Sequence, residues 1–98
     1  MDPRETARTL SDYGRAIVEA WLDDRRYATE LAKAAQLSPS FITGLQAQEY
    51  GLGTKAIVGF ASALGLSLGE FERRAQDWHR AGRPALGPEA LPPREKRR

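Results

Sequence analysis

The chain has no cysteine and only one histidine, His79, among its 98 residues. Disulfides, a cysteine-based metal site and a zinc site built from several histidines are therefore excluded. No apolar run approaches the ~20 residues that a membrane-spanning helix needs. The N-terminal sequence MDPRETARTL lacks the apolar stretch of a secretory signal. We therefore expect a cytoplasmic protein that has no cofactor and no membrane association.

Positive charge is scarce in the body of the chain, although the net charge is +2. Residues 11–80 carry eight Lys or Arg and nine Asp or Glu, whereas residues 81–98 carry five Lys or Arg and two Glu. The body is therefore slightly acidic, and the basic charge belongs to the tail. A strongly basic body would have supported binding to a polyanion, and this composition does not provide it.

Apolar residues recur at helical spacing in five segments of the chain. The clearest of them, residues 57–64, matches the i, i+3, i+4, i+7 pattern of a single helix face. We predict an all-α fold with helices over residues 11–23, 27–35, 39–46, 55–64 and from residue 67 onward.

Capping residues stand where these helices should begin and end. Ser38 suits an N-cap and Pro39 suits a first turn, where its missing N–H does no harm. Thr54 is expected to cap the start of the fourth helix, and Gly65 supplies a left-handed residue after its end. Ser67 and Glu70 have the spacing of a capping box, which predicts the start of the fifth helix.

Three regions follow from these signals. Residues 1–10 are predicted to be an N-terminal arm, although Asp2 and Pro3 also allow the first helix to begin there. Residues 11–81 form the helical domain. Residues 82–98 combine glycine, proline and charge with little else, so we predict a disordered basic tail that builds no core.

Several segments together resemble the Cro and phage-repressor type of helix-turn-helix domain, the xenobiotic-response-element (XRE) family. The segments that carry the likeness are Leu31-Ala32, Leu37-Ser38, Ser38-Pro-Ser-Phe-Ile-Thr43 and residues 60–71. The likeness covers residues 17–71 and implies a five-helix, lambda-repressor-like fold. It also implies a transcriptional regulator that binds double-stranded DNA as a homodimer on a palindromic operator, associated with the bacterial nucleoid.

The likeness implies that the third helix enters the major groove of DNA. The base-reading positions would then be Pro39, Ser40, Thr43 and Gly44, next to the N-cap residue Ser38. Lys55 matches a basic position that the family uses near the DNA backbone, and the N–H groups of Gly53 and Thr54 are available to a phosphate. For Arg25 and Arg26, phosphate contact and plain solvent exposure both stay open.

The residues at these positions depart from the family's usual chemistry. Base discrimination normally comes from Arg, Gln or Asn, whereas Pro39 has no side-chain donor and Gly44 has no side chain. Residues 38–54 contain no Lys or Arg, which limits counterion release. Trp21 and Gln46 replace an Arg–Glu pair that the family often has, and we predict one neutral hydrogen bond between them.

The last helix carries an apolar stripe that continues past the usual end of the domain. The stripe consists of Phe71, Ala75 and Trp78. It can belong to the core of one chain or lie between two chains. We predict that it forms the seam of a homodimer, because exposed aromatic residues on a small monomer would be a liability.

Two classes of function stay open, and catalysis is not one of them. The chain has no Gly-rich phosphate loop after a strand, no Cys to act as a nucleophile and only one His, His79, which we expect to lie on the surface. The fold and Lys55 favour a DNA-binding regulator. The alternative is a helix-turn-helix scaffold turned to protein–protein interaction, as in an antitoxin-like or adaptor subunit, since fold alone does not decide function.

Overall fold

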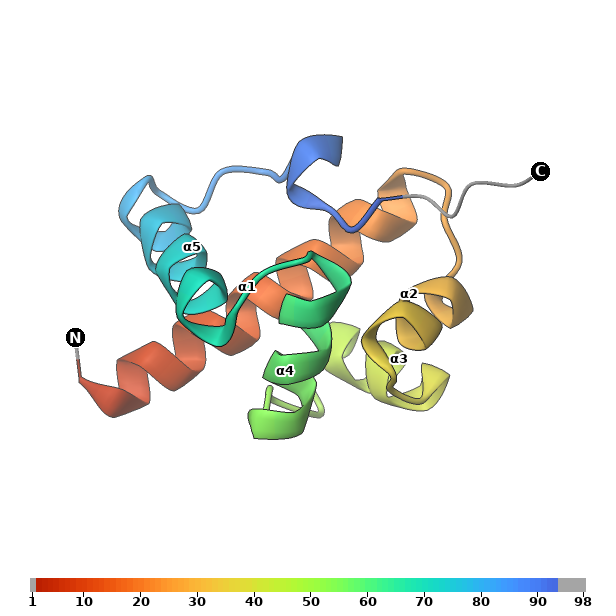
Figure 1. The fold of residues 1–98 in the computed structure, drawn as a ribbon, viewed down its shortest axis with the longest axis horizontal. Helices are drawn as coiled ribbons and strands as arrows, with labels where there is room; N and C mark the ends of the chain where they lie inside the picture. Colours follow the sequence, from red (N-terminus) through yellow and green to blue (C-terminus); the bar gives the residue numbers. More distant parts are fainter. Residues whose placement is uncertain (1, 94–98) are drawn as a thin grey trace.

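The computed structural model describes residues 2–93 (Figure 1). These residues form five α-helices and a short 3-10 helix: α1 Pro3–Asp23, α2 Ala28–Ala35, α3 Pro39–Gln46, α4 Thr54–Ala63, α5 Leu68–Arg80 and η1 Pro88–Ala90. Within the described part of the chain there is no strand, and no helix is long and apolar enough to cross a membrane. The predicted all-α fold is confirmed, and the predicted bounds of α2, α3 and α4 are correct to within one residue.

Helix α1 is longer than the main prediction, because it begins at Pro3 rather than at residue 11. Asp2 is its N-cap, and the Asp2 carboxylate accepts a hydrogen bond from the N–H of Arg4 at 3.0 Å. The alternative start at Asp2 and Pro3 is therefore the observed one. The arm is helical because the Asp2 side chain accepts from a free N–H group of the first turn, and Pro3 has no N–H group that needs a partner.

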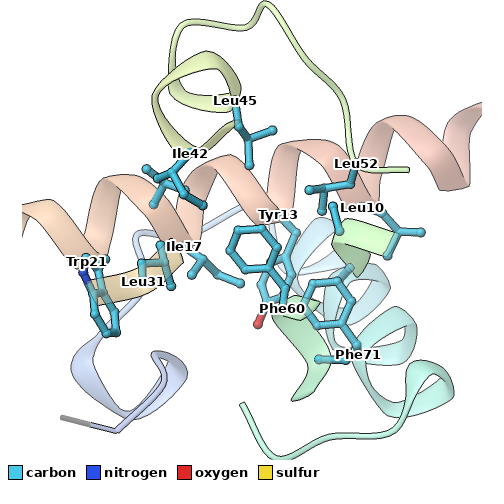
Figure 2. Packing of buried hydrophobic residues seen from close by; sticks show 14 of the residues in the cluster. Leu10, Tyr13, Ile17, Trp21, Leu31, Ile42, Leu45, Leu52, Phe60 and Phe71 are labelled. Atoms are coloured by element: carbon cyan, nitrogen blue, oxygen red, sulfur yellow. The ribbon is translucent and has the colours of Figure 1, made fainter. Parts of the chain in front are cut away.

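One hydrophobic core lies along α1, which runs the length of the molecule (Figure 1). Every other α-helix contributes buried residues to it, and Figure 2 shows side chains from these helices meeting those of α1. The residues labelled there are Leu10, Tyr13, Ile17, Trp21, Leu31, Ile42, Leu45, Leu52, Phe60 and Phe71. Helices α2, α3 and α5 all pack against α1.

Left-handed residues turn the chain between the short helices. The φ angle is 56° at Gln36, 63° at Gln48 and 71° at Gly65, and the position predicted for Gly65 is thereby confirmed. The predicted capping box is also present, since Ser67 and Glu70 each accept from the other's backbone N–H at 3.2 Å. The hydrogen bonds from the Ser67 N–H and hydroxyl lower the pKa of Glu70.

Helices α2 and α4 cross so closely that Gly59 has no room for a side chain. An added Cβ would overlap the carbonyl oxygen of Ala35. We expect Gly59→Ala to destabilise the fold by about 1–3 kcal/mol through overpacking, although Ala normally gains about 1 kcal/mol over Gly in a helix. Gly69 lies in α5 with open space around it. Gly69→Ala should therefore match or exceed wild-type stability in urea denaturation, and a Gly59→Ala protein of wild-type stability would contradict this close crossing.

The predicted disordered tail does not hold for residues 82–93. These residues turn back over the helices, and Leu91 is 6% exposed while Pro92 is fully buried. Two leucines spaced among the prolines are enough to anchor the segment, because Leu86 and Leu91 both pack on the core. The rest of the predicted tail, residues 94–98, lies outside the described residues.

Hydrogen bonds hold this C-terminal strap, residues 83–93, onto the domain. The Trp78 indole N–H donates to the carbonyl of Pro84 at 2.9 Å, and the Arg26 guanidinium donates to the carbonyl of Pro92. Figure 1 shows the strap passing over α1 toward the connection between α1 and α2. The end of the strap thus covers the region where Arg26 lies.

The predicted bond between Trp21 and Gln46 is wrong. Trp21 is buried as predicted, at 3% exposure, but its indole N–H donates to the carbonyl of Tyr27 at 2.9 Å. Gln46 is exposed. The indole sits near the last turn of α1, so it meets the N-cap of α2 rather than the end of α3. Helices α1 and α3 are joined instead by Arg15, which donates to the carbonyl of Leu45 at 3.0 Å.

Candidate nucleic-acid interface

The α2–α3 pair exposes the first turns of α3. Three residues connect the two helices, from the left-handed Gln36 to the N-cap residue Ser38. The Ser38 hydroxyl accepts from the N–H of Phe41 at 3.2 Å, which confirms the predicted cap. Ile42 and Leu45 are fully buried, and they fix which side of α3 faces outward.

Four of the predicted site residues lie exposed on this outward side: Ser38, Pro39, Ser40 and Thr43. Their polar atoms are engaged locally. Thr43 donates its hydroxyl to the carbonyl of Ser40 at 3.1 Å, and the hydroxyls of Ser38 and Ser40 lie 3.2 Å apart. The lone pairs of these oxygens can still accept from a ligand. The side chains on this surface are therefore accessible, short and uncharged.

Gly44 does not lie on the exposed surface, and its prediction as a DNA-contacting residue is corrected here. It is buried under the ring of Tyr50, which an added Cβ on Gly44 would overlap. Tyr50 itself is 49% exposed. Sequence spacing could not reveal this contact, because it depends on the left-handed turn at Gln48 that folds the following loop back over α3.

The start of α4 lies beside the start of α3. The predicted cap at Thr54 is wrong, because Thr54 is the first residue of α4 and Gly53 is its N-cap. No side chain caps this helix, so the first N–H groups of α4 are available to an anion. Lys55 is exposed in the same turn. A hollow of about 460 Å³ joins the two helix starts and is lined by Gln36, Leu37, Ser38, Phe41, Gly53, Thr54, Lys55 and Ala56. The structure thus brings four of the predicted site residues, Ser38, Gly53, Thr54 and Lys55, to one hollow.

Arg26 does not belong to this surface, which corrects its prediction as a phosphate contact. It is 7% exposed, and its guanidinium lies 4.3 Å from the centre of the Trp21 ring and 2.8 Å from the Asp24 carboxylate. The third contact is the hydrogen bond to Pro92 of the strap. A cation so enclosed has no free face for DNA. Arg25 is exposed, with a left-handed backbone at φ 59°.

The predicted dimer seam is also corrected for the two residues at its centre. Phe71 and Ala75 are completely buried within one chain, and the Phe71 ring meets Tyr13 edge-on at 5.5 Å. Trp78 is half-buried between Tyr13, at 5.3 Å, and Arg83 of the strap, at 5.2 Å. The apolar stripe therefore serves the intramolecular core, and the part that runs past the expected domain end meets the strap.

A scan against protein-family models, a search of curated proteins and a search of solved structures each found no match for this chain. Among residues 2–93 no group of His, Asp or Glu side chains could hold a metal ion. The arrangement of α2, α3 and α4 and the surface they expose therefore carry the functional proposal.

Proposed function

We propose that this chain is a lambda-repressor-like helix-turn-helix domain of the Cro and phage-repressor (XRE) type. In this proposal it binds double-stranded DNA as a transcriptional regulator, with α3 in the major groove. The observation that carries the proposal is the exposed first half of α3 beside the uncapped start of α4 and Lys55. A homodimer on a palindromic operator belongs to the same proposal, with its interface formed by residues other than Phe71 and Ala75.

The chemistry of this surface supports binding through the DNA backbone and DNA shape. The major groove admits an α-helix, and a helix start next to it can bind a phosphate. Phosphate contacts fix the register of a protein on DNA, and groove deformability adds sequence preference. Residues 38–54 carry Glu49 and no Lys or Arg. We therefore expect moderate affinity and a shallow dependence on salt.

Fluorescence anisotropy on the duplex upstream of the protein's own coding sequence tests this proposal. The wild-type protein should bind that duplex more tightly than a scrambled duplex, and its affinity should fall as salt rises. Equal binding to both duplexes would reduce the activity to nonspecific attraction. No binding at low salt would overturn the proposal.

Lys55→Ala should weaken binding to all sequences alike and lower the salt slope by ~1 unit, because in this proposal the exposed Lys55 neutralises one phosphate. Lys33→Ala is the matched control. It removes the same charge from the side of α2 that faces Pro93 of the strap. Titrations of both variants over a salt series measure the slopes. Equal slopes in Lys55→Ala and wild type would place Lys55 outside the interface.

A protein-binding scaffold is the second candidate, favoured by the uncharged face of α3 and the half-exposed Tyr50. Tyrosine is frequent among the residues that dominate protein interfaces. In this case the wild-type protein would bind no duplex even at low salt. Ser40→Arg would then abolish binding to the protein partner, whereas Lys55→Ala would have no DNA phenotype to show.

A further inference from the structure

The chain leaves α3 through a turn that reverses its direction. After the end of α3, Gln48 adopts a left-handed backbone with φ 63°. The N–H of Glu49 then donates to the carbonyl of Gly44 at 2.8 Å, and the N–H of Gln48 donates to that of Leu45 at 3.1 Å. This pair of bonds is the Schellman arrangement of a helix end. It brings Tyr50 back alongside the helix that it follows.

The Tyr50 ring is held on α3 by two contacts. It stacks on the Phe41 ring with 5.6 Å between centroids and 6° between planes. Its other contact is Gly44, where a Cβ would overlap the ring. The absence of a side chain at Gly44 is therefore what allows the ring to lie against the helix. Gly44 has no side chain with which to contact DNA, and this same absence makes room for the Tyr50 ring.

Tyr50 also has the exposure that a binding residue needs. Half of it faces solvent, and its hydroxyl has no hydrogen-bond partner in the described part of the chain. Ser40, one turn before Gly44 on α3, is also exposed. Because stacking already fixes the ring, little side-chain entropy is lost when it contacts a ligand.

We propose that Tyr50 is a specificity-determining residue of the α3 surface, in place of a side chain at Gly44. This inference rests on the proposed DNA-binding function. The ring edge offers an apolar surface to a thymine methyl group, and the hydroxyl can donate to or accept from a base edge in the major groove. Tyr50 thus supplies direct readout on a helix whose own exposed side chains are short.

Four variants test this role against a panel of duplexes that differ from the preferred site by one base pair each. Tyr50→Ala should weaken binding to the preferred duplex about tenfold, within the range of a single base contact, and should flatten the preference at one base pair. Gly44→Ala should do the same, because its methyl group displaces the ring without removing it. The double variant should lose no more than either single variant, since both remove the same contact.

Tyr50→Phe is the matched control, because it keeps the ring and removes only the hydroxyl. It should keep the thymine preference and lose whatever the hydroxyl contributes. Thermal melting checks that each variant is folded, and NMR adds a readout without DNA. A Cβ added to Gly44 would meet Cδ2 and Cε2 of the Tyr50 ring, so the chemical shifts of the Gly44 α protons should change in Tyr50→Ala.

The outcomes separate the inference from the function on which it rests. Wild type that binds no duplex overturns both. Wild type that binds, with Tyr50→Ala showing the same preferences across the panel, overturns the role of Tyr50 and leaves the proposed function standing. An equal loss on every duplex would assign Tyr50 to the DNA backbone and would also overturn it as a specificity residue. Loss at one base pair, reproduced by Gly44→Ala, supports the inference.

Discussion

Trp21→Ala should destabilise the fold by about 3–5 kcal/mol, the usual cost of truncating a buried Trp. Trp21 is 3% exposed, its indole N–H donates to Tyr27, and its ring lies against the Arg26 guanidinium. Truncation opens a cavity, leaves the Tyr27 carbonyl with fewer partners and exposes a buried cation. The total free energy of unfolding of a small domain is about 5–15 kcal/mol, so a loss of this size would leave a large fraction of the molecules unfolded.

Urea denaturation followed by far-UV circular dichroism measures this loss. Trp21→Phe is the matched control, because it keeps a buried aromatic ring while it loses the hydrogen bond to Tyr27 and part of the ring volume. Its cost should be nearer to about 1–3 kcal/mol. A melting temperature of Trp21→Ala within a few degrees of wild type would mean that the end of α1 does not pack as described.

Phe71→Ala is the second large effect, also about 3–5 kcal/mol. Phe71 is fully buried and meets the Tyr13 ring within the same chain. The loss should therefore be the same at every protein concentration. A residue in a dimer seam behaves differently, because its contribution to the melting temperature grows with concentration.

Leu68→Ala provides the control on the same helix. Leu68 is 47% exposed, so its truncation should change stability by no more than about 0.5 kcal/mol. Melting curves over roughly a hundredfold range of protein concentration distinguish the two cases. A Phe71→Ala effect that vanishes on dilution would restore α5 as a dimer seam.

Local signals predicted the helices well. Ser38 with Pro39, Gly65, and Ser67 with Glu70 each act over a few residues, and all of them have their predicted roles. Such caps depend on nearby backbone groups, so the sequence around them is sufficient. The fully buried Ile42, Leu45 and Phe60 follow in the same way from helical spacing.

The contacts that were missed join residues far apart in the chain. The carbonyl of Pro92 accepts from Arg26, which is 66 positions earlier, and no local pattern marks that pair. From its composition the strap was predicted to be part of a disordered tail, because it is poor in apolar residues. Two of those few, Leu86 and Leu91, nevertheless suffice to pack it, and packing then encloses Arg26.

The sequence predicted which positions of the candidate site are exposed better than it predicted which side chains form its surface. Ser40, Thr43 and Lys55 are exposed, as the predicted helix boundaries required. Gly44 was assigned by its place on the helix face, and spacing cannot show that a residue from the next loop covers it. The stack of Tyr50 on Phe41 depends on the left-handed backbone of Gln48. Because this residue is not a glycine, the sequence does not mark the turn.

An NMR titration of the ¹⁵N-labelled protein with its upstream duplex tests the central proposal most directly. If α3 and the start of α4 form a DNA-binding surface, amide shifts should concentrate at residues 38–44 and 49–56. The amides of α5 and the strap should change little, apart from any effect of assembly. Shifts confined to α5, the strap or the C-terminal end of α1, or no shifts at low salt, would contradict the proposed DNA-binding role of α3.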